Sequence, residues 1–241
     1  MAEENAVEKI AAFIVDTDRD SIPSEAFRTA KSAILDWTGV AIAGTQESSA
    51  RILGRYIKTM EAKDESGVIG GGFKTTADLA AWANGCAGHA LDFDDTFPSS
   101  SGYNFHPTAP ILPAILALAE KKQASGRVVL AAYVCGVEVE FCLGAAIGRS
   151  GSEAGWHPTA ILGLIGATAA SAKMLNLDLF RTKMAIGIAS SMAGGLMRNS
   201  GSMTKPLHAG NAARNGLVAK SGPGFYRGGR PGGAINARQR S

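Results

Sequence analysis

Apolar residues recur at helical spacing along most of this chain, and clear alternation typical of strands is nearly absent. Only residues 67–70 have an extended pattern. Helical spacing and the residues that flank it predict eight helices. They are expected over residues 7–15, from 24 to 39 or 44, from 75 or 76 through 83, after 107, after 126, after 158, over 179–192 and over 207–220.

Several residues mark where these helices begin. We expect Thr75 or Thr76, and Asp178, to cap helix N-termini, and Pro107 and Pro158 to stand in the first turn of a helix, where proline is tolerated. The helices are rich in Ala and Gly, which lets helix backbones approach closely. We therefore expect residues 1–220 to form one all-α helical bundle domain.

The last residues differ from the rest of the chain. Residues 221–241 contain six Gly, two Pro and four Arg, with no amphipathic period. This composition predicts a flexible tail. An aberrant or truncated end that never belonged to the ancestral fold is the other interpretation, and the sequence alone leaves both open.

The composition indicates a globular protein with a substantial core, because 46% of the residues are apolar and 19% are charged. No membrane span is expected, since the most apolar long run contains Glu138 and Glu140. The N-terminus is acidic and has no secretory pattern. Three cysteines among apolar residues suit a reducing compartment, so we expect a cytoplasmic protein.

The net charge of +3 is unevenly distributed. Residues 179–241 carry ten Lys or Arg and no acid, which leaves residues 1–178 with a net charge of −7. A basic end can bind nucleic acid or line a pocket for carboxylates. The few aromatic residues do not interleave with the basic ones, so we expect no nucleic-acid partner.

An acidic run, Asp92-Phe93-Asp94-Asp95-Thr96, follows one predicted helix. If the helix continues through the run, Asp92 and Thr96 share a face and Asp94 points elsewhere. Three interpretations of the run are open. It is a solvated acidic turn, or a divalent-metal site held by two carboxylates. In the third, it is the wall of a site in which Asp92 orients a histidine or binds a substrate hydroxyl and Thr96 donates a hydrogen bond.

Two of the four histidines are each followed by Pro-Thr, at His106 and His157. Each therefore stands just before a predicted helix. The positive end of the helix dipole favours a neutral imidazole, which can accept a proton. A capping or packed loop histidine is the simpler interpretation of either one alone.

A third polar cluster precedes the last predicted helix. Lys205 lies just before Pro206, and His208 follows three residues on. Upstream, Ser202 and Thr204 lie in a glycine-containing loop. Hydroxyls, backbone N–H groups and an ammonium at a helix N-terminus form an anion site. Arg198 and Arg214 are weaker candidates, and an ordinary solvated loop is the alternative.

These segments resemble the MmgE/PrpD family, which includes 2-methylcitrate dehydratase, cis-aconitate decarboxylase and iminodisuccinate epimerase. The resemblance covers roughly residues 5–220. It is carried by four ordered motifs: GHALDFDDTF (88–97), HPTAPILPAILALAE (106–120), GWHPTAILGLIGATAASAKMLNLD (155–178) and GLMRNSGSMTKPLHAGNAARNG (195–216).

The resemblance implies a large all-helical domain followed by a smaller α/β lid domain, in a homodimer, with the active site in the cleft between the domains. It implies small di- and tricarboxylate substrates and no metal or organic cofactor. The site residues that it implies here are Asp92, Thr96, His106, His157 and Lys205, with His208 nearby. We expect this chain to end before the lid and so to lack that half of the cleft.

The function hypothesis is a hydro-lyase acting on a hydroxylated polycarboxylate such as 2-methylcitrate, by cofactor-free proton abstraction. In it, Lys205 holds a substrate carboxylate with help from Ser202 and Thr204, and His157 or His106 moves the proton. Asp92 fixes an imidazole tautomer and Thr96 binds a substrate oxygen.

Other functions remain open at this point. Decarboxylation of cis-aconitate and epimerisation use the same proton-handling groups. A catalytically inactive helical dimerisation domain is an alternative of another class. A magnesium-dependent isoprenoid enzyme would explain the acidic run, but it needs a second carboxylate cluster and no acid follows Asp178. Nucleic-acid binding by residues 179–241 is the weakest alternative.

Overall fold

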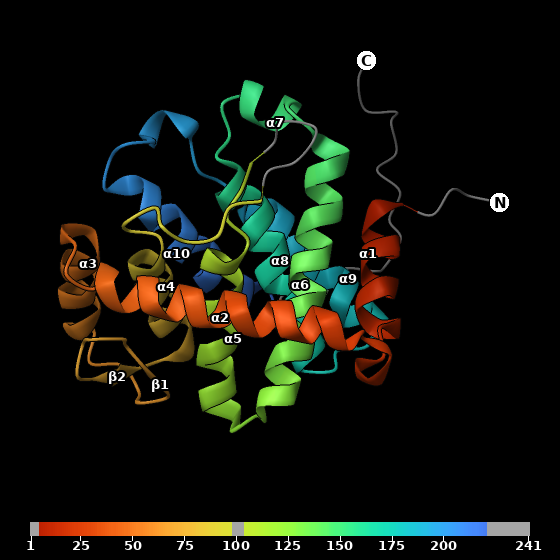
Figure 1. The fold of residues 1–241 in the computed structure, drawn as a ribbon, viewed down its shortest axis with the longest axis horizontal. Helices are drawn as coiled ribbons and strands as arrows, with labels where there is room; N and C mark the ends of the chain where they lie inside the picture. The colour runs from red at the N-terminus through yellow and green to blue at the C-terminus, as the bar shows by residue number, and fades with distance from the viewer. Residues whose placement is uncertain (1–4, 98–103, 221–241) are drawn as a thin grey trace, which may run out of the picture.

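Helix α8 (Pro158–Met174) runs through the centre of the structure, a computed structural model that describes residues 5–97 and 104–220. All of its residues except Ile161 and Lys173 are buried. Three long helices pack directly against it, namely α5 (Thr108–Lys122), α6 (Gly126–Ile147) and α10 (Thr204–Ala219). The core of the bundle therefore forms around α8 (Figure 1).

The remaining helices surround this centre. Helix α4 (Ala77–Gly88) packs on α10. Helix α2 (Ser24–Gly44) crosses the bundle from α1 (Ala6–Asp16) on one side to α3 (Ser48–Lys58) on the other (Figure 1). Helix α1 packs on α9 (Leu179–Met192). The short elements are α7 (Ser150–Glu153), the 3-10 turns η1 (Arg19–Ser21) and η2 (Met197–Asn199), and the antiparallel strands β1 (Ser66–Gly67) and β2 (Lys74–Thr75). The predicted all-α class is confirmed.

The chain builds these elements largely where its local signals predict. Asp178 caps α9, since its carboxylate accepts a hydrogen bond from the backbone N–H of Arg181 at 2.8 Å. Helices α3 and α7 have no counterpart among the predicted segments. Of the extended segment predicted at 67–70, only Gly67 lies in a strand, and the rest forms the turn toward β2. The predicted tail at 221–241 lies outside the described residues.

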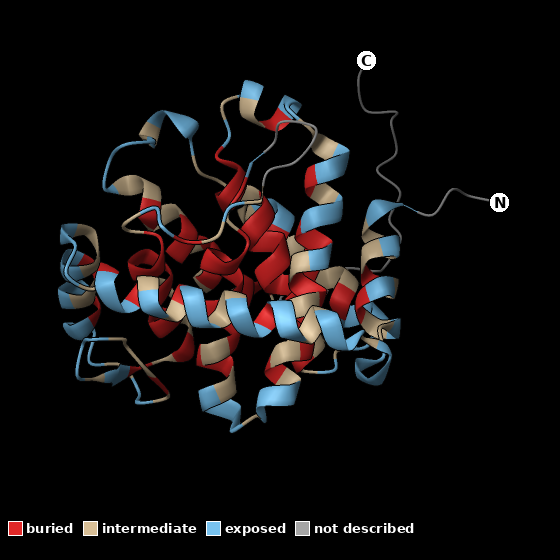
Figure 2. Cartoon of the chain, viewed as in Figure 1, coloured by how far each residue is buried: buried red, intermediate tan, exposed pale blue. Residues whose placement is uncertain are grey.

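Large apolar side chains fill the space between α2, α5 and α8. Trp37, Ile111, Leu112, Ile115 and Leu118 are almost fully buried in one cluster. Burying each such side chain contributes roughly 1.5–3 kcal/mol. Figure 2 shows this buried interior behind the exposed outer face of α2.

Helix α6 is the one helix in the described part of the chain that is long and apolar enough to cross a membrane. Half of its most apolar window is buried inside the bundle, against α8 and its neighbours. Glu140 faces this interior and is fully buried. The burial of α6 is that of a core helix.

Helices α4 and α10 approach so closely that glycine is required where they cross. A Cβ atom on Gly210 would lie 2.3 Å from the backbone oxygen of Trp82, and one on Gly85 would lie 2.8 Å from the Cα of Gly210. Atoms cannot approach to these distances, so any larger residue forces the helices apart. This crossing matters because α4 leads into the acidic run and α10 begins beside Lys205.

We expect Gly210→Ala to lower the free energy of unfolding by about 1–3 kcal/mol, because the added methyl overpacks the crossing. Urea denaturation measures this change. The matched control is Gly187→Ala in α9, where a Cβ would have no heavy atom within 4 Å. The control should be neutral or stabilising by up to about 1 kcal/mol, since alanine favours the helix. Equal effects of the two substitutions would contradict the packing argument.

Candidate active site

The acidic run leaves α4 as a loop, which corrects the prediction that Asp92 and Thr96 share a helix face. The helix ends at Gly88, and Asp92 has a φ of 59°, in the left-handed region that a continuing helix does not use. The prediction that Asp94 points elsewhere is also wrong. The loop turns the Asp94 carboxylate inward, where it is buried.

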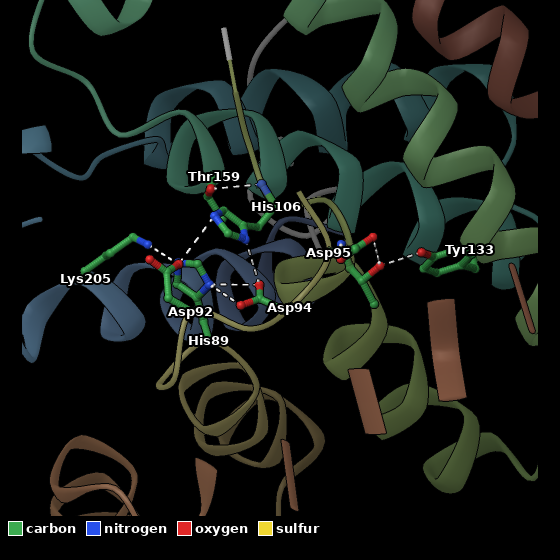
Figure 3. A network of polar contacts seen from close by, with 9 residues as sticks. His89, Asp92, Asp94, Asp95, His106, Tyr133, Thr159 and Lys205 are labelled. Atoms are coloured by element: carbon green, nitrogen blue, oxygen red, sulfur yellow. Dashed lines mark hydrogen bonds and ion pairs between the residues drawn. The ribbon is translucent and has the colours of Figure 1, made fainter. Parts of the chain in front are cut away.

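Asp94 lies between two histidines (Figure 3). Its two carboxylate oxygens are 3.0 and 2.9 Å from Nδ1 of His89, and one oxygen is 3.2 Å from Nδ1 of His106. The two imidazole rings meet edge to face, with their centroids 4.6 Å apart. The side chains of His89 and Asp94 are fully buried. One carboxylate therefore fixes the orientation of both rings.

This contact changes the charge state of the pair. Burial opposes the charged form of Asp94, but hydrogen bonds from His106 and His89 outweigh it and lower its pKa. Burial also opposes the charged form of His106, and the hydrogen bond and charge of Asp94 outweigh it and raise its pKa. This is opposite to the neutral imidazole that the helix dipole predicts. The Asp94 contact thus favours the protonated form of His106.

His157 has the opposite tendency. It caps the N-terminus of α8 and is buried, with its ring stacked on that of His89 at a centroid distance of 6.1 Å. Its Nδ1 lies 3.3 Å from Nδ1 of His208, so one of the two rings donates to the other. Burial, and then the nearby charges of His89 and His208, lower the pKa of His157 to about 3. His157 is therefore a neutral base near pH 7.

Lys205 completes the cluster from the first turn of α10. Its ammonium contacts the carboxylate of Asp92, which also lies 3.5 Å from Nε2 of His106 (Figure 3). Burial raises the pKa of Asp92, but the hydrogen bond and charge of Lys205 outweigh it and lower the pKa. Three predicted residues from three segments therefore meet at one place.

A pocket of about 370 Å³ opens beside this cluster. Its walls come from residues 47–49 at the start of α3, residues 89–92 after α4, and the loop around Ser202 and Lys205. The Ser202 hydroxyl donates to the Asn199 carbonyl at 2.7 Å and accepts from the Thr204 N–H at 3.2 Å, so it shapes the loop. The pocket offers hydroxyls and an ammonium to an anionic ligand.

Two predicted residues lie outside this network in the described part of the chain. Thr96 and Arg198 are both exposed, and neither makes a side-chain hydrogen bond or ion pair with residues 5–97 or 104–220. His208 contacts His157, as above, and Thr204 begins α10. The structure therefore brings together Asp92, His106, His157, Lys205 and His208.

Sequence reasoning assigned no role to His89 or Asp94, although both stand in the motif at 88–97. The signal was chemical, because a chain with only four histidines has one of them, His89, just before the acidic run and five residues before Asp94. What the sequence did not provide was the end of α4, which decides which aspartate turns inward.

The neighbouring aspartate anchors the loop on its other side. Asp95 accepts a hydrogen bond from the Thr108 hydroxyl at 2.7 Å, and that hydroxyl lies 2.5 Å from the Tyr133 hydroxyl. Burial raises the pKa of Asp95. Figure 3 shows Asp94 and Asp95 on opposite sides of the loop. The loop is thus fixed to α5 and α6 through Asp95 while Asp94 serves the histidines.

The cluster also contains a set of side chains that suits a metal ion. Ligand atoms of His89, Asp92, Asp94 and His106 all lie within 4.8 Å of one another, and imidazole with carboxylate is a common transition-metal donor set. The Lys205 ammonium already contacts Asp92 in this arrangement. The sequence-based expectation of a metal-free site stays a prediction.

Asp94→Asn should lower the free energy of unfolding by about 3 kcal/mol at pH 6, because it removes one partner of a buried charged pair. Asp94 contributes above the unfolded aspartate pKa of about 3.9, and His106 contributes fully below the unfolded histidine pKa of about 6.5. The difference from wild type should therefore be largest between these values. Urea denaturation across pH measures it.

The control for this experiment is Asp16→Asn, on an exposed position at the end of α1, which should stay within about 0.5 kcal/mol of wild type. An Asp94→Asn variant as stable as this control at pH 6 would show that the buried contact contributes nothing.

His157→Gln should gain stability relative to wild type as the pH falls. Folded His157 stays neutral down to about pH 3, whereas the unfolded chain takes up a proton near pH 6.5. Wild type therefore loses about 1.4 kcal/mol per pH unit below 6.5, and the variant should gain about 2 kcal/mol between pH 7 and 5. His106→Gln, whose pKa shift has the opposite sign, should show no such gain. Parallel stability curves for His157→Gln and wild type would contradict the burial of a neutral imidazole.

Comparison with known proteins agrees with this chemistry. The family model described as the MmgE/PrpD N-terminal domain matches residues 8–221. Cis-aconitate decarboxylase of Mus musculus is 35% identical over 202 residues, covering 80% of this chain and 40% of that protein. The Homo sapiens enzyme of the same name is 35% identical over 195 residues, covering 78% and 40%, and the Aspergillus terreus enzyme is 34% identical over 206 residues, covering 83% and 41%. The chain spans about two-fifths of the length of these curated relatives.

Proposed function

Because this chain belongs to the MmgE/PrpD family, we propose that its histidine cluster is the acid–base centre of a lyase that acts on small polycarboxylates. The observation that carries the proposal is the opposed behaviour of two histidines around one ring. Asp94 raises the pKa of His106, burial lowers the pKa of His157, and both rings lie beside that of His89. Pairs of titratable groups whose pKa values are driven apart supply an acid and a base at the same pH.

The substrate class follows from the charges beside the pocket. Lys205 and the polar residues Ser48, Ser49 and Ser202 line the pocket wall together with two acids, Glu47 and Asp92. A carboxylate of the substrate displaces Asp92 as the partner of Lys205. The Thr204 N–H lies at the start of α10, where the helix dipole favours an anion. Arg198 and Thr96 lie outside the pocket wall, so substrate binding by them stays a prediction.

Decarboxylation of cis-aconitate is the reaction that we place first, since three relatives carry that name. The C–C bond to the CH₂-borne carboxylate breaks and releases CO₂. The electrons of the broken bond form a new C=C bond. The π electrons of the original double bond move to its CH carbon, which takes a proton from His106 and becomes CH₂. The product is methylenesuccinate, and Lys205 stabilises the negative charge on the remaining carboxylates.

Dehydration, which sequence analysis placed first, uses the same groups in another order. His157 takes the proton from a carbon next to a carboxylate, and His106 gives its proton to the leaving hydroxyl. This is the second candidate, with 2-methylcitrate as its substrate. In both reactions Asp94 acts as a positioning residue, because its carboxylate contacts Nδ1 of both His89 and His106. His89 itself lines the pocket wall.

Mass spectrometry of the purified 241-residue chain, incubated with cis-aconitate, 2-methylcitrate and citrate, distinguishes these reactions by product mass. We expect methylenesuccinate from cis-aconitate. His106→Gln and Lys205→Ala should each lower turnover of cis-aconitate by on the order of 10²-fold or more, because the first removes the proton donor and the second removes the carboxylate partner. His157→Gln should have this effect only on dehydration, in which His157 takes the proton. EDTA should leave turnover unchanged, in keeping with the predicted metal-free site.

The control is Lys183→Ala, which removes a lysine that pairs with Glu8 in the distant α1–α9 contact, and it should keep full activity. A change under about threefold in both site variants would discredit the assignment. Absence of turnover with every substrate would favour the inactive helical dimerisation domain. Loss of turnover in EDTA would place a metal on the four donor side chains.

The homodimer expected from the resemblance also stays a proposal. It is the assembly that the resemblance implies for family members, and light scattering after gel filtration measures it on this chain. A mass of about twice 24.8 kDa is the expected result.

A further inference from the structure

A second pocket, of about 320 Å³, lies between α3 and the turn that joins β1 to β2. It shares no lining residue with the pocket beside the histidines. One wall is formed by α3, another by the turn at residues 68–73, and the floor by α4. Its volume is within the range of small-molecule sites, about 300–1,000 Å³.

Three cations of α3 line this pocket, at Arg51, Arg55 and Lys58. Their spacing of four and three residues places them on one helix face. No carboxylate oxygen of residues 5–97 and 104–220 lies within 4 Å of the charged nitrogens of these three side chains. Like charges one turn apart on a helix repel each other and destabilise it. The described fold offers them no compensating anion.

The helix does not need these cations for its own packing. Leu53 and Ile57 bury the other face of α3 against α4, in a cluster with Cys86. The Lys58 ammonium lies 5.8 Å from the ring centroid of Phe73, so the ring holds it over the pocket. All three cationic residues are exposed, and they line a concave surface.

The wall that faces the cations is apolar. Val68, Ile69, Phe73 and Ala83 contribute to it. Apolar walls lower the local dielectric constant and strengthen the attraction between the cations and a bound anion. They also provide contact area for an uncharged part of a ligand.

We propose that this pocket binds a small molecule with two linked phosphate groups and an apolar or aromatic body. Each of the two guanidinium groups can donate paired hydrogen bonds to phosphate oxygens. The three cations are spread over roughly 10 Å along the helix axis, so a single carboxylate group is too small to contact all of them. The body packs on Val68, Ile69 and Phe73. This site is independent of the proposed lyase site, so the failure of either proposal leaves the other standing.

Isothermal titration calorimetry on the full 241-residue chain tests the proposal with ADP, inorganic pyrophosphate and citrate as probes. ADP should bind with a Kd below about 100 μM, equivalent to roughly −5.5 kcal/mol. Pyrophosphate should bind at least tenfold more weakly, because it lacks a body to contact the apolar wall. Citrate should bind more weakly than ADP at this site, and raising the salt concentration should weaken ADP binding.

The double variant Arg51→Gln/Arg55→Gln should weaken ADP binding at least tenfold. The matched control is Arg149→Gln/Arg181→Gln, which removes two exposed arginines that already pair with acids elsewhere on the surface. It should leave the Kd within twofold. Circular dichroism melting shows whether each variant is folded, and Lys58→Gln provides a milder single change for the same titration.

Three results would overturn the proposal. The first is no ADP binding by the wild-type chain up to about 2 mM. The second is equal binding by folded Arg51→Gln/Arg55→Gln or Lys58→Gln and by wild type, which would place ADP elsewhere. The third is citrate binding tighter than ADP and lost in the double variant, which would make this a carboxylate site.

Discussion

The buried carboxylate of Asp94 is the contact on which the candidate site depends. It lies between His89 and His106 and has no exposure to solvent. Buried charges are costly unless they are paired, so the loop must present both imidazoles to it in one arrangement. The same contact that fixes the geometry keeps a proton on His106. Structure and acid–base chemistry therefore have one physical cause here.

Close helix packing places the other groups around this contact. Gly85 and Gly210 let α4 and α10 cross without side chains between them, so the loop after α4 lies beside the first turn of α10. The backbone N–H of His106 donates a hydrogen bond to the Thr159 hydroxyl at 3.1 Å, which joins the segment before α5 to the start of α8. Segments more than 100 residues apart in sequence thus converge, and a small residue at each crossing is the condition for it.

Much of the fold was predictable because its signals are local. Asp178 caps α9 as its side chain and position predict, and Pro158 stands in the first turn of α8. Helix α3 was missed although its signal is local, since Ile52, Leu53, Tyr56 and Ile57 recur at the spacing of one helix face. The site was predictable in part. His106, His157 and Lys205 follow from motif and charge, but the role of Asp94 depends on where α4 ends, and burial in the tertiary structure decides that.

The most direct test is an NMR titration of the four histidine rings in the wild-type chain, with ¹⁵N shifts that report charge and tautomer. At pH 6.5 the account predicts a predominantly protonated His106 beside a neutral His157, with His157 remaining neutral down to about pH 4. If both rings titrated together near pH 6.5, like exposed histidines, the Asp94 contact would not separate acid from base and the account would be wrong.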